Sequence, residues 1–352
     1  MRFLSAIRAW FFVAVVAVVG DGAGSGSVLA AEDLASLWAG VVSLDSGPGQ
    51  VPGSEAEAKR IYGKHVAVQE AALRRYLERA PEGDSRRFEA RLRLARVLTI
   101  RAEIEGRPQW QDESAKILDA LDVEGSKEQR AEVAFTRITQ WMRRNRFPDA
   151  SRRQELLGAV REFQNNFVGD RRMGRLLLEV ATRFDREPEV KRELLEAASR
   201  TELDASLRRR LEDDRLRLRT LGSVLDLRFK DFGGREFRME QKRGVPVVVL
   251  YFSEGSLPSM EAMRRVNEGL RGFPEVVRVG VSLDVEGTCV ERIRQGLGEG
   301  WVICWDGRGW QSMFARRWGV NVLPTCWLVD ARGVVVSLDA SEEIAVQIRA
   351  LK

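Results

Sequence analysis

The spacing of apolar residues changes once along this chain, near Gly222, and that change limits the folds open to it. From about Ser54 to Leu221 apolar residues recur every three or four positions, as in LRLARVL (92–98), the period of amphipathic helices. After Gly222 continuous apolar runs appear, such as VPVVVLYF (245–252), which are typical of strands buried on both faces. The sequence therefore predicts a helical domain over 54–221 and a different domain over 222–352.

The first of these domains is predicted to be an antiparallel helical array. Turn residues such as Pro81-Glu82-Gly83-Asp84 divide it into helices of roughly 12–25 residues joined by short turns. Residues 72–95 and 159–181 align as a weak internal repeat that resembles the hairpins of tetratricopeptide-like arrays. Two similar amphipathic hairpins without shared ancestry are the alternative interpretation. In either case stacked hairpins form a continuous core and a concave surface suited to protein binding.

The second domain alternates strands with helices and is predicted to be an α/β sandwich. A hairpin over 224–238 precedes the buried strand 245–252. The later elements are expected as helix 260–270, strand 276–283, helix 286–297, strand 301–305, short helix 314–318, strands 325–329 and 334–338, and helix 342–351.

The N-terminus has the layout of a secretory signal peptide, predicted over 1–30. Arg2 and Arg8 flank the start of the apolar run 9–19, and Val28-Leu29-Ala30 offers a cleavage site. That run is about half the roughly 20 residues that span a bilayer, so we expect no stable membrane span after cleavage. The alternative is an uncleaved signal that tethers the protein to the membrane. Residues 31–53, with Ser-Gly-Pro-Gly, are predicted to be a linker.

The remainder of the composition describes a soluble globular protein. Hydrophobic residues make up 44% and the mean hydropathy is −0.27. The 57 Lys and Arg residues barely exceed the 52 Asp and Glu residues and alternate with them along helices, so we predict no nucleic-acid partner. His65 is the only histidine, which excludes a histidine-based catalytic triad or a His-rich metal site. No metal and no cofactor are predicted.

Two segments of the second domain carry a family resemblance. YFSEGSLPSMEAM follows the first buried strand, and WGVNVLPTCWLVDARG enters the last hairpin. In order and spacing, 222–352 resembles the periplasmic redoxin branch of the thioredoxin superfamily, in particular the TlpA-like proteins, which are related to the AhpC/TSA group. The resemblance implies a thioredoxin fold, and the signal layout at the N-terminus fits a bacterial periplasm.

The same resemblance implies that the redox site is degenerate. The family's Trp-Cys-x-Pro-Cys segment corresponds here to Gly255-Ser256-Leu257-Pro258-Ser259, so Ser256 and Ser259 replace both cysteines. Disulfide exchange needs a thiolate, whereas a serine hydroxyl ionises far less readily and forms no disulfide. Pro324 matches the family's cis-proline. A peptide-binding groove is therefore expected at Pro258, Pro324 and Thr325.

Three cysteines remain, and each has two interpretations. Cys326 lies two residues after Pro324 and is either a buried structural thiol or a relocated nucleophile. Cys289 and Cys304 lie on a helix and on the following strand, where they either form a disulfide or remain two separate buried thiols.

The sequence thus favours an exported, non-redox adaptor that binds a protein or peptide partner. The alternative is a thiol-disulfide oxidoreductase or antioxidant redoxin that uses Cys326 or the pair Cys289 and Cys304. A structural subunit of a larger envelope assembly is a third hypothesis.

Overall fold

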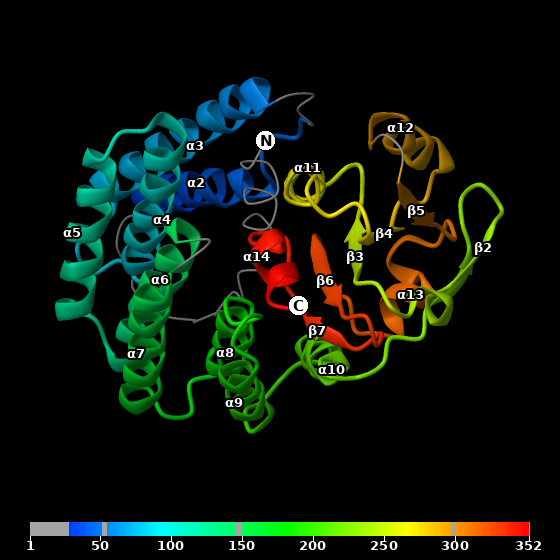
Figure 1. Cartoon of the computed structure of the whole chain (residues 1–352). Helices are drawn as coiled ribbons and strands as arrows, with labels where there is room; N and C mark the ends of the chain where they lie inside the picture. Colours follow the sequence, from blue (N-terminus) through cyan, green and yellow to red (C-terminus); the bar gives the residue numbers. More distant parts are fainter. Residues whose placement is uncertain (1–27, 51–54, 146–148, 298–299, 352) are drawn as a thin grey trace. The chain divides into compact units, whose positions relative to one another are not determined.

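A computed structural model describes residues 28–50, 55–145, 149–297 and 300–351, and these fall into two compact units that divide between Asp170 and Arg171. The predicted boundary at 221/222 therefore differs from the observed division. Figure 1 shows the helices that precede the division and the helices and sheet that follow it. Most of the signal-peptide prediction falls on 1–27, outside the described residues. Within the described ranges, no helix is both long and apolar enough to cross a membrane.

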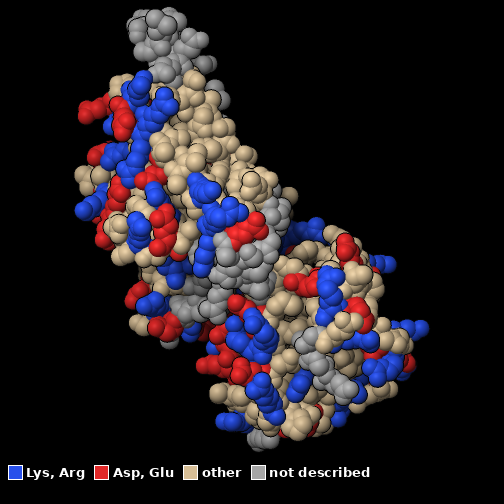
Figure 2. All heavy atoms as spheres, turned by 90° about the horizontal axis from the view of Figure 1, so that it is seen from above, with Lys and Arg blue, Asp and Glu red and all other residues tan. Residues whose placement is uncertain are grey.

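The first unit is helical, as the periodicity predicts. Its elements are α2 (Val28–Ser43), η1 (Leu44–Ser46), α3 (Glu55–Arg79), α4 (Arg87–Glu105), α5 (Gln109–Glu124), α6 (Lys127–Arg144) and α7 (Ala150–Asn166). Consecutive helices from α2 to α6 pack against their neighbours around two clusters of buried apolar side chains. Figure 2 shows Lys and Arg interspersed with Asp and Glu on the face in view.

Helix α2 corrects the predicted linker at 31–53. The prediction relied on Ser-Gly-Pro-Gly and passed over the helical spacing of Leu34, Leu37, Trp38 and Val41 just before it. These four side chains pack into the apolar cluster that α3 and α4 share. Burial of that stripe accounts for a helix where the turn residues suggested a loop.

The second repeat, 159–181, is divided between the two units because the break at 170/171 falls in its turn. The first repeat, 72–95, forms a packed hairpin of α3 and α4.

The second unit begins with three helices, α8 (Met173–Ala181), α9 (Pro188–Ser199) and α10 (Ala205–Thr220). Strands β1 (Arg228–Lys230) and β2 (Glu236–Arg238) form a hairpin, and η2 (Met239–Lys242) follows. The main sheet has the order β5-β4-β3-β6-β7. Its elements, with the intervening helices, are β3 (Val247–Phe252), α11 (Leu257–Gly269), β4 (Val277–Ser282), α12 (Gly287–Leu297), β5 (Trp301–Cys304), η3 (Gly309–Gln311), α13 (Met313–Arg316), β6 (Thr325–Val329), β7 (Val335–Ser337) and α14 (Ile344–Arg349).

Strand β3 is the centre of this sheet. It runs parallel to β4 and antiparallel to β6, and all six of its side chains are buried. On one face Val248, Leu250 and Phe252 share a cluster with side chains of α11, α12 and α14. On the other face Tyr251 meets Trp327 edge to face at 5.1 Å. The helical layer on one face and the observed strand order confirm the predicted α/β architecture.

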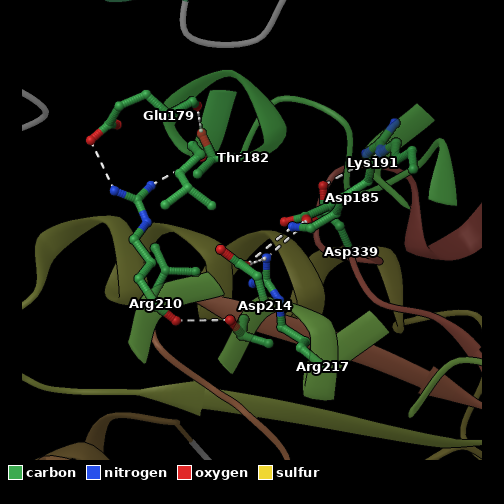
Figure 3. Close-up of polar contacts among 12 residues, drawn as sticks. Glu179, Thr182, Asp185, Lys191, Arg210, Asp214, Arg217 and Asp339 are labelled. Atoms are coloured by element: carbon green, nitrogen blue, oxygen red, sulfur yellow. Dashed lines mark hydrogen bonds and ion pairs between the residues drawn. The ribbon is translucent and has the colours of Figure 1, made fainter. Parts of the chain in front are cut away.

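A cluster of buried charges joins α9 and α10, the last two helices of the predicted helical domain (Figure 3). Arg217 Nη2 contacts Asp185 Oδ1 at 2.9 Å and Asp214 Oδ1 at 3.1 Å, and Lys191 Nζ pairs with both carboxylates. Lys191, Asp214 and Arg217 are each at most 1% exposed. Two cations thus balance two anions in a site with almost no access to water.

Two contacts explain why these helices belong to the second unit. Gly319 has φ +66°, and a Cβ there would lie 2.2 Å from the backbone oxygen of Asp213 in α10. Arg186, before α9, pairs with Asp339 at 3.4 Å and Glu343 at 3.0 Å at the approach to α14. The sequence boundary at 221/222 followed the change in periodicity, which does not report such tertiary contacts.

Lys191→Met is expected to destabilise the protein by about 3 kcal/mol, because it leaves the buried Asp214 and the partly buried Asp185 with one cation. The matched control is Arg192→Met in the same helix, where the Arg192 and Glu189 side chains are 57% and 78% exposed, and this change should cost about 0.5 kcal/mol or less. Urea unfolding followed by circular dichroism measures both. Equal effects of the two substitutions would contradict the assignment of a buried charge cluster.

Candidate functional site

Ser256 and Ser259 lie where β3 leads into α11. Ser256 is the N-cap residue of α11, and its Oγ accepts the backbone N–H of Ser259 at 3.4 Å. Pro258 occupies the first turn, where a missing N–H costs nothing. Ser259 is fully buried, and its hydroxyl has no hydrogen-bond partner within the described parts of the chain. The two residues thus lie one helical turn apart, one capping the helix and one beneath the surface.

The approach to this cap is held by Asp284, a residue that sequence reasoning missed. Asp284 Oδ1 accepts the Ser253 hydroxyl at 2.7 Å and the Glu254 N–H at 3.0 Å. Its Oδ2 accepts the Ser282 hydroxyl at 2.8 Å. The signal was present in the sequence, because an aspartate soon after a buried parallel strand lies at the sheet edge where the neighbouring strand also ends. Asp284 therefore fixes the loop that delivers Ser256.

The segment before β6 completes the site. The Leu323–Pro324 peptide bond is cis, which confirms the sequence prediction, and Pro324 is half-buried. Thr325 is buried, is paired with Tyr251 of β3, and donates its hydroxyl to the Val322 carbonyl at 2.8 Å. Leu323 forms no backbone–backbone hydrogen bond with any described residue.

Cys326 lies in the core. It is 2% exposed, and its Cα is paired with that of Leu250 in the register between β6 and β3. Burial is the main cause that raises the pKa of its thiol, and the nearby Asp339 raises it further. Cys304, at the end of β5, is 1% exposed, and burial likewise raises the pKa of its thiol. Neither position favours a thiolate.

Cys289 is half-buried and lies beside an ion pair. Arg292 donates to both carboxylate oxygens of Glu254 at 2.6 and 2.5 Å, and its Nη2 lies 3.4 Å from the Cys289 sulfur. Hydrogen bonding to Glu254 is the main cause that raises the pKa of the Cys289 thiol. All three thiols are free, so the structure contains no bond between Cys289 and Cys304.

His65 and the carboxylates form no metal centre in the described residues, where no group of three His, Cys, Asp or Glu side chains could hold an ion. His65 is buried, and its Nε2 lies 3.0 Å from the Leu44 carbonyl. It joins α3, to which it belongs, to η1, as a structural residue would.

Comparison with known proteins gives structural neighbours only. No protein-family model and no curated protein matches the chain. The thioredoxin domain of a thiol-disulfide oxidoreductase from Bacteroides vulgatus is 16% identical, with a TM-score of 0.33, over 38% of this chain and 98% of its own. A thiol-disulfide oxidoreductase from Bacteroides fragilis is 18% identical, with a TM-score of 0.31, and the match covers 36% of this chain and 97% of that protein. A secreted disulfide oxidoreductase of Mycobacterium tuberculosis is 14% identical, with a TM-score of 0.31, and the match covers 36% of this chain and 96% of that protein.

The fold of the C-terminal region follows from its own topology. A central strand parallel to one neighbour and antiparallel to the other, a helix that begins at the carboxyl end of that strand, and a cis-proline before the next strand define a thioredoxin-type domain. The chain therefore joins a helical region to a thioredoxin-type domain, as the sequence predicts.

Glu254→Gln is expected to accelerate alkylation of Cys289 by iodoacetamide several-fold at pH 8. Removing the carboxylate that raises the thiol pKa increases the thiolate fraction, and the remaining Arg292 acts in the same direction. Site-resolved mass spectrometry measures the rates. Glu286→Gln is the matched control, since that side chain is not among the groups that shift the thiol. Labelling of Cys326 in the folded protein as fast as Cys289 would contradict its buried position.

Proposed function

We propose that this protein is an exported, non-redox adaptor that uses its thioredoxin-type domain to bind an extended segment of a protein partner. The observation that carries the proposal is the pair Ser256 and Ser259. One hydroxyl is engaged as a helix cap and the other is buried, and neither can form a disulfide with a substrate. Neither position carries a thiol nucleophile, although the helix N-terminus and the cis Leu323–Pro324 bond beside them are present.

The three thiols support the non-redox part. A replacement nucleophile needs a lowered pKa and access to substrate. Cys304 and Cys326 are buried, and the pKa of every thiol is raised rather than lowered. The alternative of an oxidoreductase that uses Cys326, or Cys289 with Cys304, therefore finds no support in their environment.

The segment around Pro324 supports the binding part. Among the described residues, the backbone groups of Leu323 have no backbone hydrogen-bond partners, and they lie next to the exposed Val322 and the half-buried Pro324. An extended peptide laid along this segment could pair with those groups, as in β-strand addition. The helical region offers a second surface of the kind that repeat arrays use for protein binding. Export to a bacterial periplasm is proposed on the signal-type N-terminus alone.

The wild-type protein is expected to give no insulin reduction by dithiothreitol above the uncatalysed rate. The double variant Ser256→Cys/Ser259→Cys should form an internal disulfide and gain turnover, because a cap residue and a residue one turn later place two sulfurs at the start of α11, where the helix dipole favours a thiolate. Turbidity measures turnover, and free-thiol titration measures the disulfide.

The single variant Ser256→Cys is the control, because it adds a thiol without a resolving partner. Wild-type turnover that Cys326→Ser or Cys289→Ser abolishes would overturn the non-redox proposal. If the double variant forms no disulfide, two cysteines at these positions are not sufficient for a redox site in this domain.

A further inference from the structure

The segment between β5 and β6, together with Val285 after β4, exposes a group of apolar side chains. Trp310, Met313 and Val322 are 49%, 57% and 42% exposed, and Val285 is 68% exposed. We call these four residues the apolar patch. Most large apolar side chains of this unit are buried, so an exposed tryptophan in η3 and an exposed methionine at the start of α13 mark a candidate interaction surface.

Contacts of Val285 and Val320 place the patch beside the site. Val285 directly follows Asp284, which holds the approach to Ser256, and Val285 Cγ2 lies 3.2 Å from where a Cβ on Gly309 would be. Gly309 precedes Trp310. At the other end, the N–H of Val320 donates to the Ala315 carbonyl at 2.9 Å, which folds the chain leading to Val322 and Pro324 back onto α13. The patch thus extends from the Asp284 loop toward the cis-proline.

Three exposed arginines accompany the patch. Arg308 has no side-chain hydrogen bond or ion pair with any described residue. Arg316 donates to the neutral amide of Gln311 at 3.2 Å, and Arg317 lies 3.5 Å from Asp226, which also pairs with Arg228. The nearest carboxylate in sequence, Asp306, is already bound by the Ser312 hydroxyl and the Arg308 N–H. Asp213 of α10 also acts electrostatically on Arg316. Arg308 is therefore the arginine of this group whose guanidinium has no carboxylate partner among the described residues.

We propose that the partner segment is an extended peptide with apolar side chains flanked by Asp or Glu. Its apolar side chains cover Trp310 and Met313, and its carboxylates pair with Arg308, Arg316 and Arg317. Charge complementarity at an interface rim selects the partner and its register. This inference rests on the proposed peptide-binding function and names the chemistry of the peptide.

The test uses the full chain and three fluorescein-labelled ten-residue peptides with the same Leu-Phe-Leu centre, flanked by Glu, by Gln or by Lys. Fluorescence anisotropy should give the order Glu, then Gln, then Lys. The Glu peptide should bind about tenfold tighter than the Gln peptide at low salt, from several rim ion pairs of modest strength. The difference should shrink in 0.5 M NaCl.

Two variants locate the binding. R308Q/R316Q/R317Q should remove the advantage of the Glu peptide and leave the Gln peptide unchanged. W310S/M313S should weaken all three peptides. The control R75Q/R130Q/R161Q removes the same charge from exposed positions of the helical unit. It should change neither the advantage of the Glu peptide nor the affinity for the Gln peptide.

The outcomes separate the inference from the function on which it rests. Equal affinity for Glu and Gln peptides, unaffected by the arginine variant, would overturn the acidic partner and keep peptide binding. No binding by any peptide to folded protein would overturn both. Sedimentation with anionic phosphatidylglycerol vesicles that W310S/M313S abolishes, or self-association abolished by the same variant, would overturn the peptide as occupant.

Discussion

The structure of the thioredoxin-type domain depends on burial of β3 on both faces. A strand with six buried side chains needs a layer on each side, and α11, α12 and α14 supply one of them. Because β3 is central, its carboxyl end is also where β4 ends and α11 begins, so polar residues from three elements meet there. Ser256, Asp284 and Pro324 are brought together by this one packing requirement, although they lie far apart in sequence.

At that meeting point stand a helix N-terminus, two serines and a cis-proline. The N-terminus of α11 would stabilise a thiolate, but here it receives a neutral hydroxyl that serves as a cap. Ser259, fully buried with an unbonded hydroxyl, occupies a position that suits a sulfur better, because a thiol loses less when left without a hydrogen bond.

The three helices before the sheet are part of this arrangement. The charge cluster of Asp185, Lys191, Asp214 and Arg217 fixes α9 against α10, and the backbone of α10 closes on Gly319. Gly319 belongs to the segment that carries the apolar patch toward Pro324. The proposed binding surface is thus supported from beneath by helices that sequence periodicity assigned to the other domain.

The sequence by itself determined the elements and their order. Runs such as 245–252 and 325–329 identify buried strands, and the helical periods of 54–221 identify helices, because local burial patterns repeat with the geometry of each element. The places of Ser256 and Ser259 after the first buried strand, and of Pro324 before the last hairpin, could also be identified from the spacing of their segments. Helix α2 could be predicted from the helical spacing of apolar residues between Leu34 and Val41. The nearby turn residues led instead to the prediction of a linker.

Tertiary structure alone decided which groups meet. Contacts between residues tens of positions apart set the unit boundary at 170/171, the buried charges around Lys191 and the hydrogen bonds that Asp284 accepts. They also leave the three thiols free. Periodicity carries no information about such pairs. The burial of Cys326 and the position of Cys289 beside Glu254 are likewise results of packing. The pKa of each thiol, and with it the choice between a nucleophile and an inert side chain, follows from that environment rather than from the residue type.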